Sequence, residues 1–580
     1  LNVMKRRNFI STLTTGSGGL ISASALGNPF AAYGKTDSQI KTHESSNRFS
    51  ADLVIAGGGL GGCAAAFAAL RNNMSVILTE ETDWIGGQVS QQGVPPDEHQ
   101  WIETHGAPVL YRAFRKRIRD YYRRNYPLTD HARENEFLNP GNGSVSRICH
   151  EPWVAVQVLN EMFAPYVSAR KLIILKEHKM IKAEVKYNKV ESLISISSKE
   201  GNTYCLEGKY FIDATELGDL LPLTGTAYRT GSESREETGE WHASAESRPD
   251  NNQAFTMCFA MDYLKGEDWT LPKPTDYGFW KKYQPELTPS WAGKLLELNY
   301  SDPKTLKPKN LGFHPEGEKT GNSLNLWLYR RLIDPGNFQD GFYKGGATIV
   351  NWPQNDYMLG NIVDVSESEL KKHVDQAKQL SLSMLYWLQT EAPRPYGGKG
   401  WPGLRLRNDM MGTADGLAKY PYVREARRIK ALFTILEEHV GAEQRAKVSG
   451  LQGAELKSAH FHDSVGIGYY HIDLHPSSGG DNYIDFGSLP FQIPLGALVP
   501  EKMENLLPAN KNIGTTHITN GCYRLHPVEW SIGEAAGMLV PFALERGLTP
   551  RQVREDKVML AEFQSFIKSQ GIETEWPDKI

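Results

Sequence analysis

The chain has 580 residues, of which 40% are apolar and 23% charged, and its formal net charge is −4. This length exceeds one ordinary hydrophobic core, so we expect at least two domains. The small negative charge argues against nucleic acid or an anionic membrane as a partner, and no apolar run reaches the about 18 residues that an integral membrane segment needs.

The N-terminal stretch is typical of an export signal. The sequence MKRRNFI, which starts at Met4, resembles a twin-arginine signal and is followed by a weakly apolar stretch with possible cleavage sites at Ala25 and Ala32. The alternative is a basic tail without a targeting role. We predict a signal peptide over 1–32, a polar linker over 33–50, and a periplasmic or secreted mature chain.

Residues 51–88 carry the strongest local pattern. An apolar run over 53–56 predicts a buried parallel strand, and it leads into glycines at G-x-G-x-x-G spacing, an alanine-rich helix and a second strand. In such a unit the glycines provide a tight turn, close approach to a pyrophosphate and helix packing, while an acid after the second strand accepts ribose hydroxyls. The predicted dinucleotide-binding residues are Gly57, Gly59, Leu60, Gly61, Gly62 and Glu80.

A second glycine turn indicates which dinucleotide binds. Gly86, Gly87 and Gln88 follow the acid closely, and this arrangement resembles flavoproteins that bind FAD in an extended pose. NAD-binding domains usually lack this turn, so the resemblance implies FAD. The G-x-G-x-x-G spacing recurs over 398–403, but no strand precedes it and a proline interrupts it, so we interpret that match as a loop.

The next segment predicts helices over 111–126 and 151–164, then several strands that form a small antiparallel insertion. The first helix is strongly basic, and we interpret its charges as a solvated face rather than a site for a polyanion. A strand then ends at Asp213-Ala214-Thr215-Glu216. Many FAD enzymes have Ala-Thr-Gly here, so Ala214 and Thr215 are predicted to contact FAD, whereas Glu216 replaces the usual glycine.

Residues 226–440 carry no nucleotide signal and are rich in Trp, Tyr and Pro, which is typical of a substrate domain. We predict helices over 366–390 and 422–440. The aromatic residues suit a sugar-like or ring substrate, although such residues also build cores. Upstream, His99 and His105 are candidates for substrate contact or, together with Cys149, for a covalent flavin tether.

Histidines gather over 460–475. His460 and His462 have the spacing of two metal ligands on one strand face, but the runs alternate with apolar residues as ordinary strands do. The chain's five cysteines are scattered without a C-x-x-C pair, which argues against a thiolate metal centre. We therefore predict no metal, and a histidine, His471 or His475, that faces the substrate.

The closing segment is the second strong signal. A strand over 505–509 runs into a turn, and Arg524, His526 and Pro527 lead into a helix of small residues. Proline suits the first turn of a helix, and the positive end of this helix is aimed at whatever lies beyond it.

Together these residues resemble the FAD-dependent oxidoreductase family that shares its fold with fumarate reductase flavoproteins, over most of 50–545. The resemblance implies an α/β fold, in which a Rossmann-like FAD-binding domain combines a parallel sheet with a small antiparallel insertion. This domain is expected over 51–225 and 441–545, with an α+β substrate domain inserted at 226–440 and a helical tail over 546–580. The C-terminal residues implied to contact FAD are Asn512, Gly514, Thr515 and Gly533.

The resemblance also implies the chemistry: hydride transfer from a C–H bond of a small organic or sugar-like substrate to the flavin, with oxygen or an external carrier as the electron acceptor. We predict His526 as the base, Arg524 as the group that orients the substrate, and His471 as a further catalytic residue; a helix-capping role is the alternative for His526. Fumarate reductases have Leu-Gly-Gly where this chain has Leu525-His526-Pro527. The alternative functions are a C=C reductase of an unsaturated acid and an exported glycan-binding protein with structural FAD.

Overall fold

The computed structural model describes residues 40–43, 47–317 and 323–577. The predicted signal peptide over 1–32 lies outside these residues. Within the predicted linker over 33–50, strand β1 (Lys41–His43) already pairs antiparallel with the start of β2 (Arg48–Ala56). In the described part of the chain, no helix has the length and apolarity required to cross a membrane.

The largest sheet has eight strands and confirms the predicted fold class. Its parallel part consists of neighbouring strands that arrive from distant parts of the sequence, and its other edge is an antiparallel insertion. The order is β4 (Leu172–Lys176), β3 (Val76–Glu80), β2, β7 (Thr203–Asp213), β6 (Lys189–Ser197) and β5 (His178–Lys186), with β22 (Leu506–Pro508) on β7.

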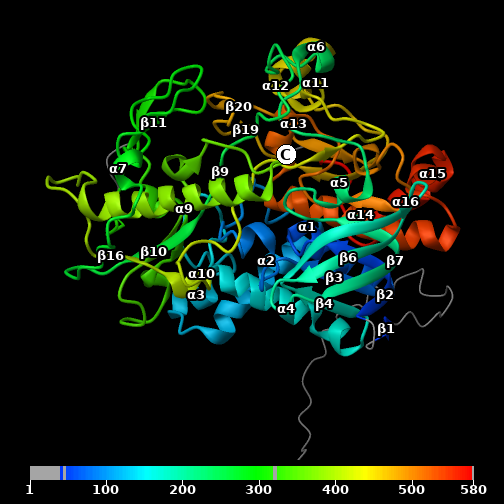
Figure 1. Cartoon of the computed structure of the whole chain (residues 1–580), viewed down its shortest axis with the longest axis horizontal. Helices are drawn as coiled ribbons and strands as arrows, with labels where there is room; N and C mark the ends of the chain where they lie inside the picture. The colour runs from blue at the N-terminus through cyan, green and yellow to red at the C-terminus, as the bar shows by residue number, and fades with distance from the viewer. Residues whose placement is uncertain (1–39, 44–46, 318–322, 578–580) are drawn as a thin grey trace, which may run out of the picture. The chain divides into compact units, whose positions relative to one another are not determined.

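Alternate residues of β2 enter different apolar clusters, as the period of a strand requires. Leu53 and Ile55 belong to a cluster with helices α1 (Leu60–Arg71) and α14 (His526–Arg546), whereas Val54 and Ala56 belong to a cluster on the other face. Figure 1 shows α1 and α14 together beside the sheet. A Cβ at Gly533 would lie 2.0 Å from the carbonyl oxygen of Gly61, so the two helix backbones touch.

The helices beside this sheet agree with the helix ranges predicted from the sequence, and a second sheet follows them. Helices α2 (Val109–Asn125) and α4 (Pro152–Ser168) confirm the helices predicted before β4. A four-stranded antiparallel sheet and helix α9 (Glu367–Thr390) then share an apolar cluster rich in tryptophan. The order of that sheet is β13 (Arg331–Ile333), β14 (Ala347–Val350), β10 (Phe259–Tyr263) and β16 (Leu404–Leu406).

Short elements complete the fold. The strand pairs are β11 (Asn299–Ser301) with β12 (Pro308–Asn310), β15 (Asp356–Tyr357) with β9 (Phe255–Thr256), β17 (Arg428–Ile429) with β8 (Tyr228–Arg229), β18 (Ser464–Gly468) with β21 (Phe491–Pro494), and β19 (Ile472–Leu474) with β20 (Ile484–Phe486). The short helices are α3 (Asp130–Glu134), α5 (Leu220–Thr224), α6 (Arg235–Thr238), α7 (Tyr277–Trp280), α8 (Leu326–Tyr329), α10 (Asn408–Met411), α11 (Glu437–Val440), α12 (Ala442–Ser449), α13 (His517–Tyr523), α15 (Pro550–Glu555) and α16 (Lys557–Ser569).

The helix predicted over 422–440 is wrong. Only strand β17 and the short helix α11 lie within this range, and the remainder has no regular structure. The charged residues do not form a solvated helix face: Arg424 pairs with Asp356, whereas Arg428 pairs with Glu233. Buried guanidinium groups with partners in different directions require an extended backbone here. The loop predicted over 398–403 is confirmed.

Candidate active site

The glycine turn after β2 forms because backbone atoms approach it from two sides. Gly57 has a φ of +99°, and a Cβ there would lie 2.1 Å from the carbonyl oxygen of Ala214, at the end of β7. A Cβ at Gly61 would lie 1.6 Å from the carbonyl oxygen of Ala509, just beyond β22. Only glycine, which has no side chain, fits at either position. The ends of β2, β7 and β22 therefore meet at the start of α1.

The second glycine turn lies against the first. Gly86, with a φ of +117°, donates a hydrogen bond from its amide to the carbonyl of Gly58 at 2.7 Å. The Gln88 side chain then donates to the carbonyl of Arg524 at 3.1 Å and to the carboxylate of Glu529. This glutamine therefore joins the glycine turns to the beginning of α14.

A cleft lies at the carboxyl ends of these strands. Glu80 is held in its wall, because its carboxylate accepts a hydrogen bond from the amide of Gly58 at 3.0 Å and another from the amide of Thr82 at 2.8 Å. Burial nevertheless raises the pKa of Glu80 to about 7. The predicted cofactor residues in the cleft wall are Gly57, Gly59, Glu80, Ala214 and Thr215.

The remaining predicted cofactor residues lie outside the cleft wall. Gly62 packs on the turn, where a Cβ would lie 2.0 Å from the carbonyl oxygen of Gly57, and Gly533 packs on Gly61. Asn512 donates to the carbonyl of Asp213 at 3.0 Å and so joins the turn after β22 to the end of β7. The others are Leu60 at the start of α1, Gly86, Gly87 and Gln88 in the second turn, and Gly514 and Thr515 beside the segment 431–435.

A second cavity is lined by Arg524, His471 and His475, three of the side chains predicted to meet a substrate. Arg524 lies in its wall and pairs with Asp473 at 3.0 Å. The same wall includes Asp97, whose amide donates a hydrogen bond to His526 Nδ1. We call this the substrate cavity; it reaches the glycine turns through Arg524, whose carbonyl binds Gln88.

His526 does not lie free in this cavity. Its Nδ1 accepts from the amide of Asp97 at 3.1 Å, and its Nε2 lies 3.2 Å from the carbonyl oxygen of Val94. Burial lowers the pKa of His526 to about 3, so the ring is neutral. With both ring nitrogens bonded to the backbone, this arrangement supports a role in holding the segment 94–97 against α14, and the predicted role as a base remains a prediction.

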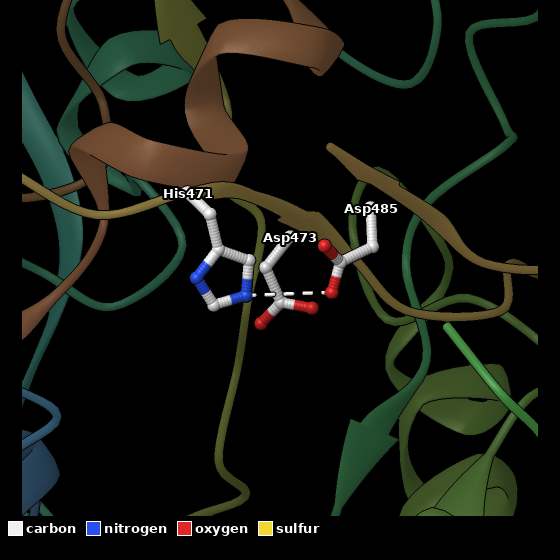
Figure 2. A group of neighbouring side chains, drawn as sticks. All are labelled: His471, Asp473 and Asp485. Atoms are coloured by element: carbon white, nitrogen blue, oxygen red, sulfur yellow. Dashed lines mark ion pairs between the residues drawn. The ribbon is translucent and has the colours of Figure 1, made fainter. Parts of the chain in front are cut away.

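Two histidine–aspartate pairs do face the cavity. His471 Nε2 lies 3.4 Å from Asp485, with Asp473 beside both (Figure 2). His475 Nδ1 lies 2.6 Å from Asp356, which in turn pairs with Arg424 at 3.0 Å. The tertiary structure thus brings together His471 and Arg524, which the sequence predicted as catalytic residues. His475 lies in the same cavity wall.

These pairs differ in their electrostatics. Burial acts to lower the pKa of His471, but the hydrogen bond to Asp485 and the charges of Asp473 and Asp485 raise it above the usual value. Burial opposes ionisation of Asp356, yet Arg424 and His475 hold the pKa of its carboxyl below the usual range. Asp356 is therefore a carboxylate that fixes the orientation of the His475 ring.

The family model for FAD dependent oxidoreductases matches residues 52–567. The chain belongs to this family. It is therefore an enzyme, an oxidoreductase with FAD as its cofactor. A search of curated proteins found no match.

The solved structures to which the chain shows a low similarity include several flavoenzymes. A quinol fumarate reductase variant from E. coli shares 12% identity and a TM-score of 0.29, with 90% of this chain and 74% of that chain covered. A geranylgeranyl bacteriochlorophyll reductase-like protein from Thermoplasma acidophilum shares 10% identity and a TM-score of 0.29, with 90% and 85% covered. With L-proline dehydrogenase from P. horikoshii the values are 14% and 0.17, and the match covers 32% of this chain but only 24% of that one.

The buried polar atoms around the glycine turns fit FAD. Gln92 is fully buried just after the second turn, and neither atom of its side-chain amide has a protein partner. Oε1 of Glu216, a residue of the cleft wall, is also buried without a partner. Unpaired buried polar groups are costly, so a ligand with donors and acceptors in this position would satisfy them.

The motif search missed two charged residues in this flavoenzyme site. Lys511 is buried and pairs with Glu216 at 2.6 Å, directly beside the glycine turns. Glu529 accepts a hydrogen bond from the amide of Gly61 at 3.0 Å. The presence of Glu216 where the family usually has glycine was the only signal in the sequence, because a buried acid requires a partner.

Among the described residues, one group of three possible metal ligands has its atoms within 4.8 Å of one another: His471, Asp473 and Asp485 (Figure 2). His460 and His462 are not in it. The pairing of His471 with Asp485, and of Asp473 with Arg524, accounts for this proximity without a metal ion.

Proposed function

We propose that this flavoenzyme oxidises a C–H bond of a hydroxylated, sugar-like substrate bound in the substrate cavity. The observation that carries this proposal is His475, which lies in the same cavity wall as Arg524 and is paired with the buried Asp356 behind it. When bound, FAD supplies the acceptor for the hydride.

We assign proton transfer to His475 rather than His526. Asp356 binds His475 Nδ1 and so directs Nε2 away from it, where it can receive the proton of a substrate hydroxyl. Asp473 lies 3.7 Å from Nε2, and its pKa is lowered to about 2 because His475 and Arg524 outweigh the effect of burial. It therefore stays ionised and would stabilise a protonated His475 ring.

The charges of the cavity favour a neutral substrate over an unsaturated dicarboxylic acid. Arg330 pairs with Asp97, Arg424 with Asp356, and Arg524 with Asp473, so each cation already has an anion. Each of these guanidinium groups still has a buried Nε–H without a partner, which is suited to hydroxyl acceptors. The alternative of a C=C reductase lacks this support.

The decisive experiment measures the reduction of the flavin under nitrogen by a panel of sugars and other alcohols. The reduction is monitored as bleaching of the flavin absorbance. We expect His475→Gln to slow bleaching about 100-fold or more, with its FAD content unchanged, because a positioned base contributes about that factor. The exposed His462 provides the matched control, and His462→Gln should match the wild type. Equal rates in His475→Gln and the wild type would remove His475 as the base; no bleaching by any panel member would favour the glycan-binding alternative.

We also propose that the chain is exported through the twin-arginine route and passes its electrons to oxygen or an external carrier. The support for export is the MKRRNFI stretch alone. Replacement of Arg6 and Arg7 by lysine should leave the protein in the cytoplasmic fraction, and an unchanged distribution would contradict the proposal. Oxygen consumption during turnover would distinguish the two acceptors.

A further inference from the structure

A further cavity adjoins the substrate cavity, and we call it the outer cavity. The two share Pro303, Tyr483 and Asp485 in their walls. The walls of the outer cavity and of the cofactor cleft have no residue in common, so neither the cofactor nor the proposed proton transfer accounts for the outer cavity.

The walls of the outer cavity contain buried polar atoms without partners. Glu240 is only 1% exposed; its Oε1 accepts from Thr516 and from the amide of Glu437, but its Oε2 has no partner. The hydroxyl of Tyr483 and Oδ1 of Asp485 are also buried and unpaired, at the boundary between the cavities. Native proteins leave few such groups, so these three atoms point to a ligand.

These atoms include both donors and acceptors. Burial raises the pKa of Glu240 to about 8, so at neutral pH its carboxyl group is protonated and can donate a hydrogen bond. The Asp485 side chain, paired with His471, is an acceptor, while the Tyr483 hydroxyl can serve as either. A ligand with several hydroxyl groups would satisfy all three.

Two acidic residues in the wall of the outer cavity are already paired with arginines, which argues against a free cation as its ligand. Glu233 pairs with Arg428 at 3.0 Å, and Asp481 pairs with Arg248 at 2.5 Å. Apolar surface is also present, including Ile484 and Phe486 of β20. A ring with hydroxyl groups at its edge and C–H groups on its faces combines the two requirements.

We propose that the outer cavity is a binding subsite for a second hydroxylated ring, covalently linked to the one that is oxidised. The substrate is then at least two units long and passes Tyr483 and Asp485. This inference rests on the proposed oxidation of a sugar-like substrate and adds the length of that substrate.

The test compares single sugars with matched disaccharides, glucose with cellobiose and galactose with lactose, as reductants of the holoenzyme flavin under nitrogen. We expect at least one disaccharide to reach half-maximal reduction at about tenfold lower concentration than its single-ring partner, since one or two additional hydrogen bonds contribute about that factor. Glu240→Met should abolish this difference without a change in the reduction by the single sugar, and Glu240→Gln, which retains a donor, should preserve it.

A second variant covers the case in which Glu240→Met does not fold. Ser244 lies half-buried at the wall of the outer cavity, and Ser244→Trp should fill it and abolish the same difference. If single sugars and disaccharides reach half-maximal reduction at the same concentration, and neither variant changes that concentration, the subsite is overturned. The proposed function would remain intact. A wild-type flavin that no sugar of either length reduces would instead overturn the proposed function, and this inference with it.

Discussion

Lys511 carries a buried positive charge beside the glycine turns, and Glu216 is its anionic partner. The side chains are 1% and 7% exposed, respectively, so water does not solvate either charge. Burial acts to lower the pKa of Lys511, but Glu216 and Glu529 raise it, and the lysine stays charged. Glu216, which stands where a flavoenzyme of this family usually has glycine, is therefore paired with a cationic side chain from a distant part of the chain.

This pair predicts strong coupling between two substitutions. Lys511→Met and Glu216→Gln should each lower the free energy of unfolding by about 3–5 kcal/mol, because each leaves one buried charge without its partner. The double variant should lose less than the sum by more than about 1 kcal/mol. Urea titrations at one fixed FAD concentration measure the four values, and additivity within about 0.5 kcal/mol would show that the pair is not coupled.

The histidines show that residue type alone does not predict which side chain faces the substrate. His471 was expected to face a substrate and lies in the substrate cavity, whereas His526 was expected to be a base and has both ring nitrogens bonded to the backbone. The sequence contains no information on which ring is free. That depends on Val94 and Asp97, which the fold brings to His526 from a distant segment.

At the scale of elements, helix α2 is held to the rest of the fold by buried arginines. Arg115 and Arg119 both donate to Glu103, in the loop before the helix. The expectation of a solvated basic face was therefore wrong for these two residues, although Lys116 and Arg117 are exposed. The hydrophobic spacing predicted the helix, but not which of its charges face inward.

The Glu103 carboxylate predicts a pH-dependent contribution to stability. Burial acts to raise the pKa of Glu103, but hydrogen bonds from Arg115 and Arg119 lower it to about 2, below the about 4.3 of an unfolded chain. A group whose folded pKa is lowered stabilises the fold above the unfolded value, and this contribution is lost as the pH falls towards 2. Glu103→Gln should therefore cost up to about 3 kcal/mol at pH 7, and less with each step below about pH 5.

Urea titrations of the wild type and Glu103→Gln from pH 7 to pH 3 measure this difference. The matched control is Glu161→Gln, because Glu161 also pairs with an arginine of α2 but is 44% exposed. An exposed pair contributes about 0.5 kcal/mol or less, so the control should change little at any pH. A Glu103→Gln difference that stays constant with pH would contradict the assignment.

Two helix predictions show what sequence can establish at this scale. The helix over 366–390 was predicted correctly because it has apolar residues at helical spacing, and its capping box, Ser366 with Glu369, is local. The range 422–440 also contains helix-forming residues, but the ion pairs of Arg424 and Arg428 outweigh their propensity. Partners of that kind are invisible before the chain is folded.

At the scale of the whole molecule, the carboxyl ends of parallel strands β2, β3, β7 and β22 place the cofactor cleft at one edge of the sheet. The three residues considered for a covalent flavin tether lie outside the wall of this cleft. Cys149 is fully buried, and burial raises the pKa of its thiol to about 12, so it is not a reactive thiolate. Burial therefore disfavours a covalent bond between Cys149 and the flavin.

Acid precipitation of the purified holoenzyme tests this arrangement. We expect the yellow colour to remain in the supernatant after the protein is removed, because the thiol among the tether candidates, Cys149, is buried and protonated. A yellow pellet would contradict this expectation, and absorption spectra of Cys149→Ser, His99→Asn and His105→Asn pellets would then identify the attachment site.

The amino-acid sequence by itself determined the features that depend on neighbours along the chain: the glycine turn between β2 and α1, the second turn at Gly86, the antiparallel insertion and the start of α14 next to Pro527. Each follows from backbone freedom, periodicity or capping within about 25 residues. Only the tertiary structure decided which charged side chains meet, as in His475 with Asp356 and Lys511 with Glu216, and where the two cavities adjoin. These contacts join residues more than 100 positions apart, and local physical chemistry does not determine such pairings.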